Sequence, residues 1–152
     1  MCSITWGERE DGLCEIIDVI YTQEPMEITE NSVANAYIKF NVNQAEIERN
    51  NGGRGFARNV REKIQGKVAT VVNDFHQSAN KEARIYSNSS WIERNVLFPH
   101  DWRQRFPKYY EAMTTYQAQG KNKHDDAPDA TTGIAETMTQ RQIKVQLFKG
   151  GL

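Results

Sequence analysis

The chain has 152 residues, 38% of them hydrophobic, and a formal net charge of -1. This is the length of one ordinary domain with a modest core. A mean hydropathy of -0.73 and the lack of a run of about 18 apolar residues argue against a membrane span. Residues 1–6 are not expected to be a signal peptide. Cys2 and Cys14 lack metal-ligand or redox spacing, which is typical of reduced thiols in a cytosolic protein.

The charge is unevenly distributed along the chain. Residues 1–48 carry a net charge of -8, residues 49–108 carry +7, and residues 109–152 are neutral. A basic middle beside acidic segments would suit a polyanion that is held by its backbone while metal-bound carboxylates act on it. The alternative, in which these segments mix in space and form no patch, is equally open.

The first half of the chain predicts a hairpin followed by alternating helices and strands. Strands are predicted at 3–8 and 13–22 because both are rich in β-branched and aromatic residues. Pro25 ends the second strand, and Thr29 is the predicted cap of a helix over about 30–41. The next predicted elements are a strand at 44–48, a helix at 54–65 and a buried strand at 67–75.

The second half predicts mainly helices. They cover 80–94, 102–119 with a break or late start at Pro107, and 125–139, with a short extended piece at 96–98. Residues 142–148 alternate apolar and polar, so 140–152 is expected to be a final strand or a flexible tail. Together the elements predict the α/β class, with a mixed sheet flanked by helices, an antiparallel hairpin at one side and parallel strands at the other.

The stretch HDDAPDA, residues 124–130, places Asp125, Asp126 and Asp129 within five positions. Asp125 is a good N-cap and proline is tolerated in a first turn, so a helix is predicted to start here. The helix N-terminus stabilises carboxylates, and these hard oxygen ligands suit Mg²⁺ or Mn²⁺. A plain helix start with acidic first-turn residues is the alternative. His124 could orient a carboxylate or a metal-bound water.

A second candidate site is AEIERNNGGRG, residues 45–55. A strand that ends at Glu48 places a carboxylate at the edge where ligands bind in open α/β sheets. Gly52 and Gly53 allow close backbone approach, and the next helix N-terminus could meet a phosphate. The alternative is a strand–turn–helix connection with a surface glutamate. The Gly-Lys-Ser/Thr ending of a P-loop occurs nowhere in the chain, so no ATP site is predicted.

Basic side chains between and beside these two stretches could contact phosphates, although most such side chains are simply solvated. The candidates are Arg54, Arg58, Lys81, Arg84, Lys121 and Lys123. Asp18 lies inside a predicted strand, where aspartate is depleted. It could therefore point toward a site or pair with an arginine.

Four blocks together resemble the C-terminal nuclease domain of a tailed-bacteriophage terminase large subunit. The blocks are DVIYTQEPMEITE (18–30), IERNNGGRGFARNV (47–60), NKEARIYSNSSWI (80–92) and YQAQGKNKHDDAPDATTGIAE (116–136). They stand in the family's order and at compatible spacing, and they cover nearly the whole chain. The last block paired with the Glu-x-Asn-Asn-Gly-Gly block is the specific part of the resemblance.

The resemblance implies an RNase H-like fold and metal-dependent cutting of concatemeric viral double-stranded DNA during genome packaging. Of the family's three acidic positions, Glu48 matches the glutamate at the end of a later strand. Asp125, Asp126 and Asp129 match the aspartate of the last motif. These four residues are the expected catalytic carboxylates, with Glu48, Asp125 and Asp129 as metal ligands. Two divalent ions, Mg²⁺ or Mn²⁺, are expected in the complete site.

The chain also departs from the family. It carries no P-loop ATPase motor, and Thr131 stands where the family usually has an apolar residue. It is expected to be a single domain over 1–152 that begins after the family's first, central strand, so that strand's catalytic aspartate has no counterpart.

The expected partners are double-stranded DNA, the missing N-terminal terminase segment, the small terminase subunit and the portal, with no membrane. The expected location is the cytoplasm of the bacterial host of a phage or prophage. Two other readings are open. One is a non-catalytic remnant that serves as a docking or DNA-binding module of the packaging machinery. The other is a different RNase H-like nuclease, such as a junction resolvase.

Overall fold

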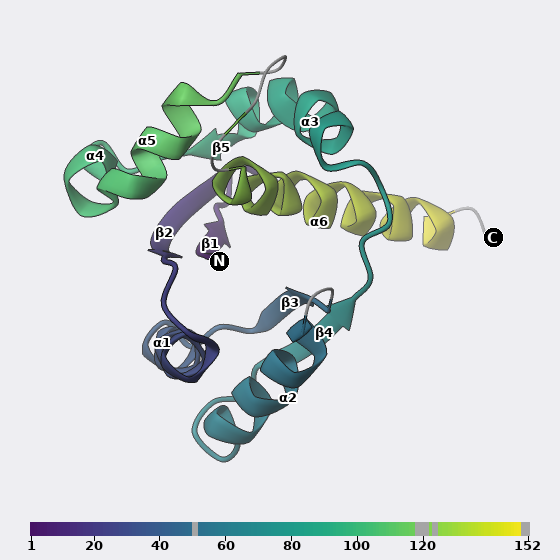
Figure 1. Cartoon of the computed structure of the whole chain (residues 1–152). Coiled ribbons are helices and arrows are strands. Elements are labelled where there is room, and N and C mark those ends of the chain that lie inside the picture. The colour runs from purple at the N-terminus through teal and green to yellow at the C-terminus, as the bar shows by residue number, and fades with distance from the viewer. Residues whose placement is uncertain (50–51, 118–121, 123–124, 150–152) are drawn as a thin grey trace. The chain divides into compact units, whose positions relative to one another are not determined.

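The computed structural model describes residues 1–49, 52–117, 122 and 125–149, with the side chains of 142–149 excluded (Figure 1). The chain folds as two compact units. Unit 1 contains Met1, Ser3 and Thr22–Ala79, and unit 2 contains Cys2, Ile4–Tyr21 and the chain from Asn80 onward. No helix in the described ranges is long and apolar enough to cross a membrane.

Unit 1 is built on two short parallel strands joined by a helix. Its elements are α1 (Met26–Lys39), β3 (Gln44–Glu48), α2 (Gly53–Ile64) and β4 (Val71–Phe75). The strands pair in register from Gln44 with Val71 to Glu48 with Phe75. Parallel strands need such a crossover because a two-residue turn cannot return the chain to the same end of the sheet. The predicted strand at 44–48 is confirmed, whereas β4 begins at Val71 rather than at residue 67.

Helix α2 buries one apolar face, and Arg61 of the same helix forms hydrogen bonds with β4. Its buried side chains, Phe56, Ala57, Val60 and Ile64, recur three or four positions apart, which is the spacing of one helix face. Arg61 donates to the Val72 carbonyl at 3.0 and 2.8 Å and to Asp74 at 2.8 Å. The hydrogen bond from Arg61 lowers the pKa of the Asp74 carboxyl below its ordinary value.

Helix α1 starts earlier than the sequence predicted. The Pro25 carbonyl accepts from the amides of Ile28 and Thr29, so the first turn begins at Met26. The prediction that Thr29 caps the helix is therefore wrong. Thr29 is buried inside the first turns, where its hydroxyl donates to the Met26 carbonyl at 3.2 Å. Pro25 therefore both ends the preceding strand, as predicted, and fixes φ in a range that suits a helix start.

Unit 2 combines a three-stranded sheet with four helices among its described residues. The elements are β1 (Cys2–Glu8), β2 (Cys14–Tyr21), α3 (Lys81–Asn95), β5 (Val96–Leu97), α4 (Trp102–Arg105), α5 (Pro107–Thr115) and α6 (Asp126–Lys149). The strand order is β1-β2-β5, with β5 parallel to β2. The turn between β1 and β2 is closed by the amides of Arg9 and Gly12, which bond to the carbonyls of Leu13 and Arg9.

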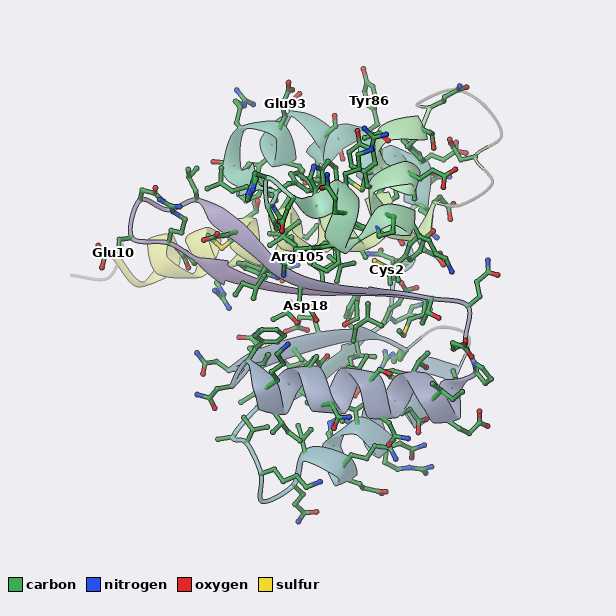
Figure 2. The ribbon with its side chains drawn as sticks, turned by 90° about the vertical axis from the view of Figure 1, so that its left-hand side faces the viewer. Cys2, Glu10, Asp18, Tyr86, Glu93 and Arg105 are labelled. Atoms are coloured by element: carbon green, nitrogen blue, oxygen red, sulfur yellow. The ribbon has the colours of Figure 1, made fainter. Side chains whose placement is uncertain are left out.

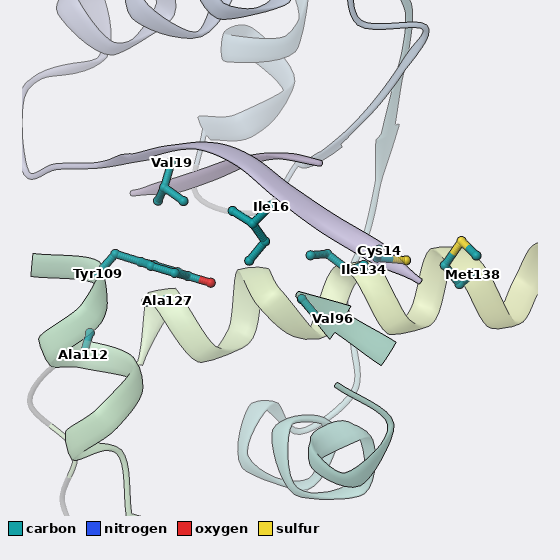
Figure 3. Close-up of a cluster of buried hydrophobic side chains, with 9 residues drawn as sticks. All are labelled: Cys14, Ile16, Val19, Val96, Tyr109, Ala112, Ala127, Ile134 and Met138. Carbon is teal, nitrogen blue, oxygen red and sulfur yellow. The ribbon is translucent and has the colours of Figure 1, made fainter. Parts of the chain in front are cut away.

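The core of unit 2 lies between β2, β5, α5 and α6. Figure 3 shows its nine buried side chains, which are Cys14, Ile16, Val19, Val96, Tyr109, Ala112, Ala127, Ile134 and Met138. Trp102 packs edge-on against Tyr109 with ring centroids 6.0 Å apart, which joins α4 to this core. Arg105 also ties α4 to β2, because it donates to the Ile17 carbonyl at 2.9 Å (Figure 2).

The predicted α/β class is confirmed, since small sheets with parallel pairs and one hairpin are flanked by helices. The predicted break at Pro107 is also confirmed, because α4 ends at Arg105 and α5 begins at Pro107. Residues 142–148 differ from the expected strand or tail: α6 continues through Lys149. Their alternation of apolar and polar residues did not distinguish a strand from the extension of a helix that had already begun.

The hydroxyl of Thr131 explains why a polar residue is tolerated in this core. Thr131 is fully buried, lies 2.7 Å from the Tyr109 hydroxyl and donates to the Ala127 carbonyl at 2.7 Å. The buried tyrosine therefore has the partner that such groups normally require.

We expect Thr131→Val to lower the free energy of unfolding by about 1–2 kcal/mol, because the buried Tyr109 hydroxyl loses its partner. Urea denaturation would measure the change. Thr131→Val combined with Tyr109→Phe should recover most of the loss, since both polar groups are then absent. An increase in stability for Thr131→Val alone would contradict this explanation.

Candidate functional site

The predicted helix start at the three aspartates is present. The Asp129 amide bonds to the Asp125 carbonyl at 3.1 Å, so Asp125 directly precedes the first turn of α6. Asp126 and Asp129 fall in that turn together with Pro128. Unbonded amides and the dipole of the helix favour negative charge at this end. The local sequence thus places three carboxylates at one helix N-terminus.

The three carboxylates meet at one ammonium group. The Nζ atom of Lys81, the first residue of α3, lies 3.0 Å from Asp125, 3.3 Å from Asp126 and 3.6 Å from Asp129. Burial disfavours the charge of Lys81, but its hydrogen bond to Asp125 and the negative charges of the aspartates raise its pKa above the ordinary value. Lys81 therefore serves as a cation shared by the three aspartates.

Arg84, one turn further along α3, forms a more deeply buried ion-pair network. Its guanidinium lies 2.7 Å from Oδ1 of Asp129 and donates to both carboxylate oxygens of Glu136 at 2.8 and 2.7 Å. The side chains of Arg84 and Asp129 are only 10% and 12% exposed. Glu136 was not singled out from the sequence. Its spacing of seven from Asp129 places both on one helix face and is the signal that could have found it.

The aspartates also act on three groups from other elements of unit 2. Burial raises the pKa of the Cys2 thiol to about 12, and the charges of Asp126 and Asp129 contribute. Burial and then the charge of Asp126 raise the pKa of Tyr21 above the ordinary value. Burial, then the charge of Glu82, and then those of Asp125 and Asp129 raise the pKa of Tyr116. The acidic cluster therefore lies near the start of β1, the end of β2 and the end of α5.

The donor chemistry of this cluster fits a hard divalent cation, because carboxylate oxygens are the ligands that Mg²⁺ and Mn²⁺ prefer. In the described part of the chain, however, no three Asp, Glu, His or Cys side chains are grouped so that they could hold a metal ion. The oxygens of Asp125, Asp126 and Asp129 instead surround the Lys81 ammonium.

Glu48 stands where the sequence placed it, as the last residue of β3. Gly52, which directly precedes α2, has a φ of 93°. A Cβ atom on Gly53 would overlap the carbonyl group of Glu48, so the helix can start this close to the strand only with glycine there. Glu48 belongs to unit 1 and the aspartates to unit 2, so a joint site of these carboxylates stays a prediction.

The remaining predicted residues have varied environments. Arg54 and Arg58 are exposed on α2, as a role in phosphate contact requires. Asp18 is partly buried in β2, and no hydrogen bond or ion pair within the described ranges joins it to the aspartates. Three predicted residues, Lys121, Lys123 and His124, lie outside the described residues.

In a comparison with protein families, the model of the terminase RNaseH-like domain family matches residues 1–136. Comparison with curated proteins and comparison with solved structures gave no match. The matched range includes Glu48, the three aspartates, and Lys81 and Arg84.

Proposed function

Since the chain belongs to the terminase RNaseH-like domain family, we propose that it is the nuclease module of a bacteriophage terminase. In this role it cuts concatemeric viral double-stranded DNA during packaging and requires divalent metal ions. The proposal rests on the family and on one geometric observation. The carboxylates of Asp125, Asp126 and Asp129 converge on a single positive charge at 3.0 to 3.6 Å.

The proposed ligands of the two ions are Glu48, Asp125 and Asp129, with Asp126 as a further carboxylate of the site. Divalent ions held there would polarise the scissile phosphate and promote the attack of water on it. The chain's own contribution is to hold the three aspartates at one helix N-terminus, where their oxygens lie around the Lys81 ammonium. Arg84 holds Asp129 through its Oδ1 atom at 2.7 Å.

DNA would be held by basic side chains through its phosphates. Arg54 and Arg58 are the proposed contacts on α2, since both are exposed. Lys121 and Lys123, which stand just before the aspartates in the sequence, are proposed to continue this role. Lys81 and Arg84 face carboxylates, and we assign them to the acidic cluster. The proposed partners are the small terminase subunit, the portal and the terminase ATPase segment, in the cytoplasm of the bacterial host.

The test is cleavage of supercoiled plasmid with Mn²⁺ or Mg²⁺ by the 152-residue chain, alone and together with the N-terminal terminase segment. We expect nicked and linear DNA, no product with EDTA, and a loss of at least about 100-fold for Glu48→Gln and for Asp129→Asn. Circular dichroism should establish that both variants are folded, because Asp129 also pairs with Arg84 at 2.7 Å.

Two matched variants control for the loss of one negative charge. Glu46→Gln changes an exposed glutamate on the same strand as Glu48. Asp101→Asn changes an aspartate of unit 2 that pairs with Arg105 at the long distance of 3.8 Å. Both should cut like the wild-type chain. Metal-independent cutting, no cutting at all, or equal cutting by Glu48→Gln and Asp129→Asn would refute the proposed nuclease.

A further inference from the structure

We propose that Lys81 is a built-in counter-cation: its ammonium holds the three aspartates together in the absence of metal and leaves when a divalent ion binds. This inference rests on the proposed function, since it concerns how the same acidic cluster receives its metal. It assigns to Lys81 a role in regulating metal binding instead of a contact with DNA.

The first argument is the place that the ammonium occupies. Nζ lies 3.0 Å from Oδ1 of Asp125, 3.3 Å from Oδ1 of Asp126 and 3.6 Å from Oδ2 of Asp129. One cation thus meets an oxygen of every aspartate in the cluster. A divalent ion bound by the same oxygens would need this space, and two cations cannot share it. Metal binding and the Lys81 contact are therefore mutually exclusive.

The second argument is the contrast between Lys81 and Arg84. The Arg84 side chain is 10% exposed and is held by two carboxylates, whereas the Lys81 side chain is 37% exposed. Lysine has a flexible four-carbon stem, so its head can turn into solvent without moving the helix. The helix start itself is fixed independently, because the Asn80 side chain accepts from the Ala83 amide at 3.0 Å.

The third argument is that the two carboxylate oxygens of Asp129 contact different cations. Oδ1 faces Arg84 at 2.7 Å, and Oδ2 faces Lys81 at 3.6 Å. Arg84 can keep the carboxylate oriented through Oδ1 while Lys81 departs from Oδ2. Charge also favours the exchange, because a doubly charged ion attracts the three aspartates more strongly than one ammonium does at the same distance.

The test compares Mn²⁺ binding by the wild-type chain and by Lys81→Met, which keeps the stem and removes the charge. Isothermal titration calorimetry is expected to show binding that is at least about tenfold tighter in Lys81→Met, because the competing cation is gone. Lys81→Arg, which keeps the charge, should bind no more tightly than the wild type. Lys108→Met removes an exposed lysine of the same unit and controls for net charge.

Thermal unfolding gives a second readout. In EDTA, Lys81→Met should melt at a lower temperature than the wild type, since the aspartates repel one another. Mn²⁺ should raise its melting temperature by more than it raises that of the wild type. A Lys81→Met chain that is unfolded in EDTA should fold when Mn²⁺ is added.

Three results would overturn the inference. If Lys81→Met binds Mn²⁺ no more tightly than the wild type while Asp129→Asn loses binding, Lys81 is not a competitor, yet the metal site stands. If the tightening is equal in Lys108→Met, net charge alone explains it. If neither the wild type nor Lys81→Met binds Mn²⁺ or is stabilised by it, this inference and the proposed metal site both fail.

Discussion

Replacing Arg84 with methionine is expected to lower the free energy of unfolding by about 3 kcal/mol. The reason is that Arg84 neutralises two carboxylates in a poorly solvated place: the side chains of Asp129 and Glu136 are 12% and 28% exposed. Methionine fills most of the same space but leaves both negative charges without this partner. Denaturation in urea, followed by circular dichroism, would measure the loss.

Arg94→Met is the matched control, since Arg94 is an exposed arginine on the same helix that donates to the Ser90 carbonyl at 3.0 Å. A surface change of this kind should stay within about 0.5 kcal/mol. Arg84→Met combined with Glu136→Met should be more stable than Arg84→Met alone, because one of the two buried charges is removed as well. Equal stability of Arg84→Met and Arg94→Met would show that the network contributes nothing.

Most helices and strands could be predicted from the sequence because residues within or next to each element determine where it begins and ends. The strand that ends at Glu48 is bounded by a glycine cluster, and the break before Pro107 follows from the missing amide of proline. The helix start directly after Asp125 is also marked locally, by a residue type that favours the N-cap position and by a proline in the first turn. The same patterns failed at the other end of α6, where residues 142–148 form helix. Alternation over seven residues is weaker evidence than continuation of an established helix.

The candidate site was predictable only in part. The crowding of Asp125, Asp126 and Asp129 is visible in the sequence, and so is the spacing of Lys81 and Arg84. What the sequence could not show is that these two sets meet, because about 45 positions separate them along the chain. From the sequence alone, Lys81 and Arg84 are predicted to contact DNA phosphates. Helix α3 packs beside α6 (Figure 1). Lys81 and Arg84 pair there with Asp125 and Asp129 at 3.0 and 2.7 Å.

The ion pairs of Lys81 and Arg84 offset the repulsion among the three aspartates. Three carboxylates at one helix start repel one another, and the helix dipole offsets only part of that repulsion. Lys81 and Arg84 supply the remaining positive charge within 3.0 and 2.7 Å. These ion pairs offset the repulsion without a metal ion. In the exchange proposed above, the more exposed Lys81 is the cation that leaves and the buried Arg84 is the one that stays.

The second large effect is expected at Gly53, beside the other predicted carboxylate. A Cβ atom there would overlap the Glu48 carbonyl, and backbone cannot move aside as the end of a side chain can. Gly53→Ala should therefore force β3 and α2 apart where they join and cost about 2 kcal/mol. The shift also displaces Glu48, so plasmid cleavage by this variant should fall further than its loss of stability explains.

Gly55→Ala is the matched control two residues along the same helix. No atom lies within 4 Å of a Cβ placed there, and Gly55 does not need a positive φ. Alanine should therefore fit and stabilise the protein by about 0.5 kcal/mol, since it restricts the unfolded chain. Urea denaturation of the two variants should thus give changes of opposite sign. If Gly53→Ala is as stable as Gly55→Ala, the close approach of Gly53 to Glu48 does not constrain this junction, and glycine there has no bearing on the position of the carboxylate.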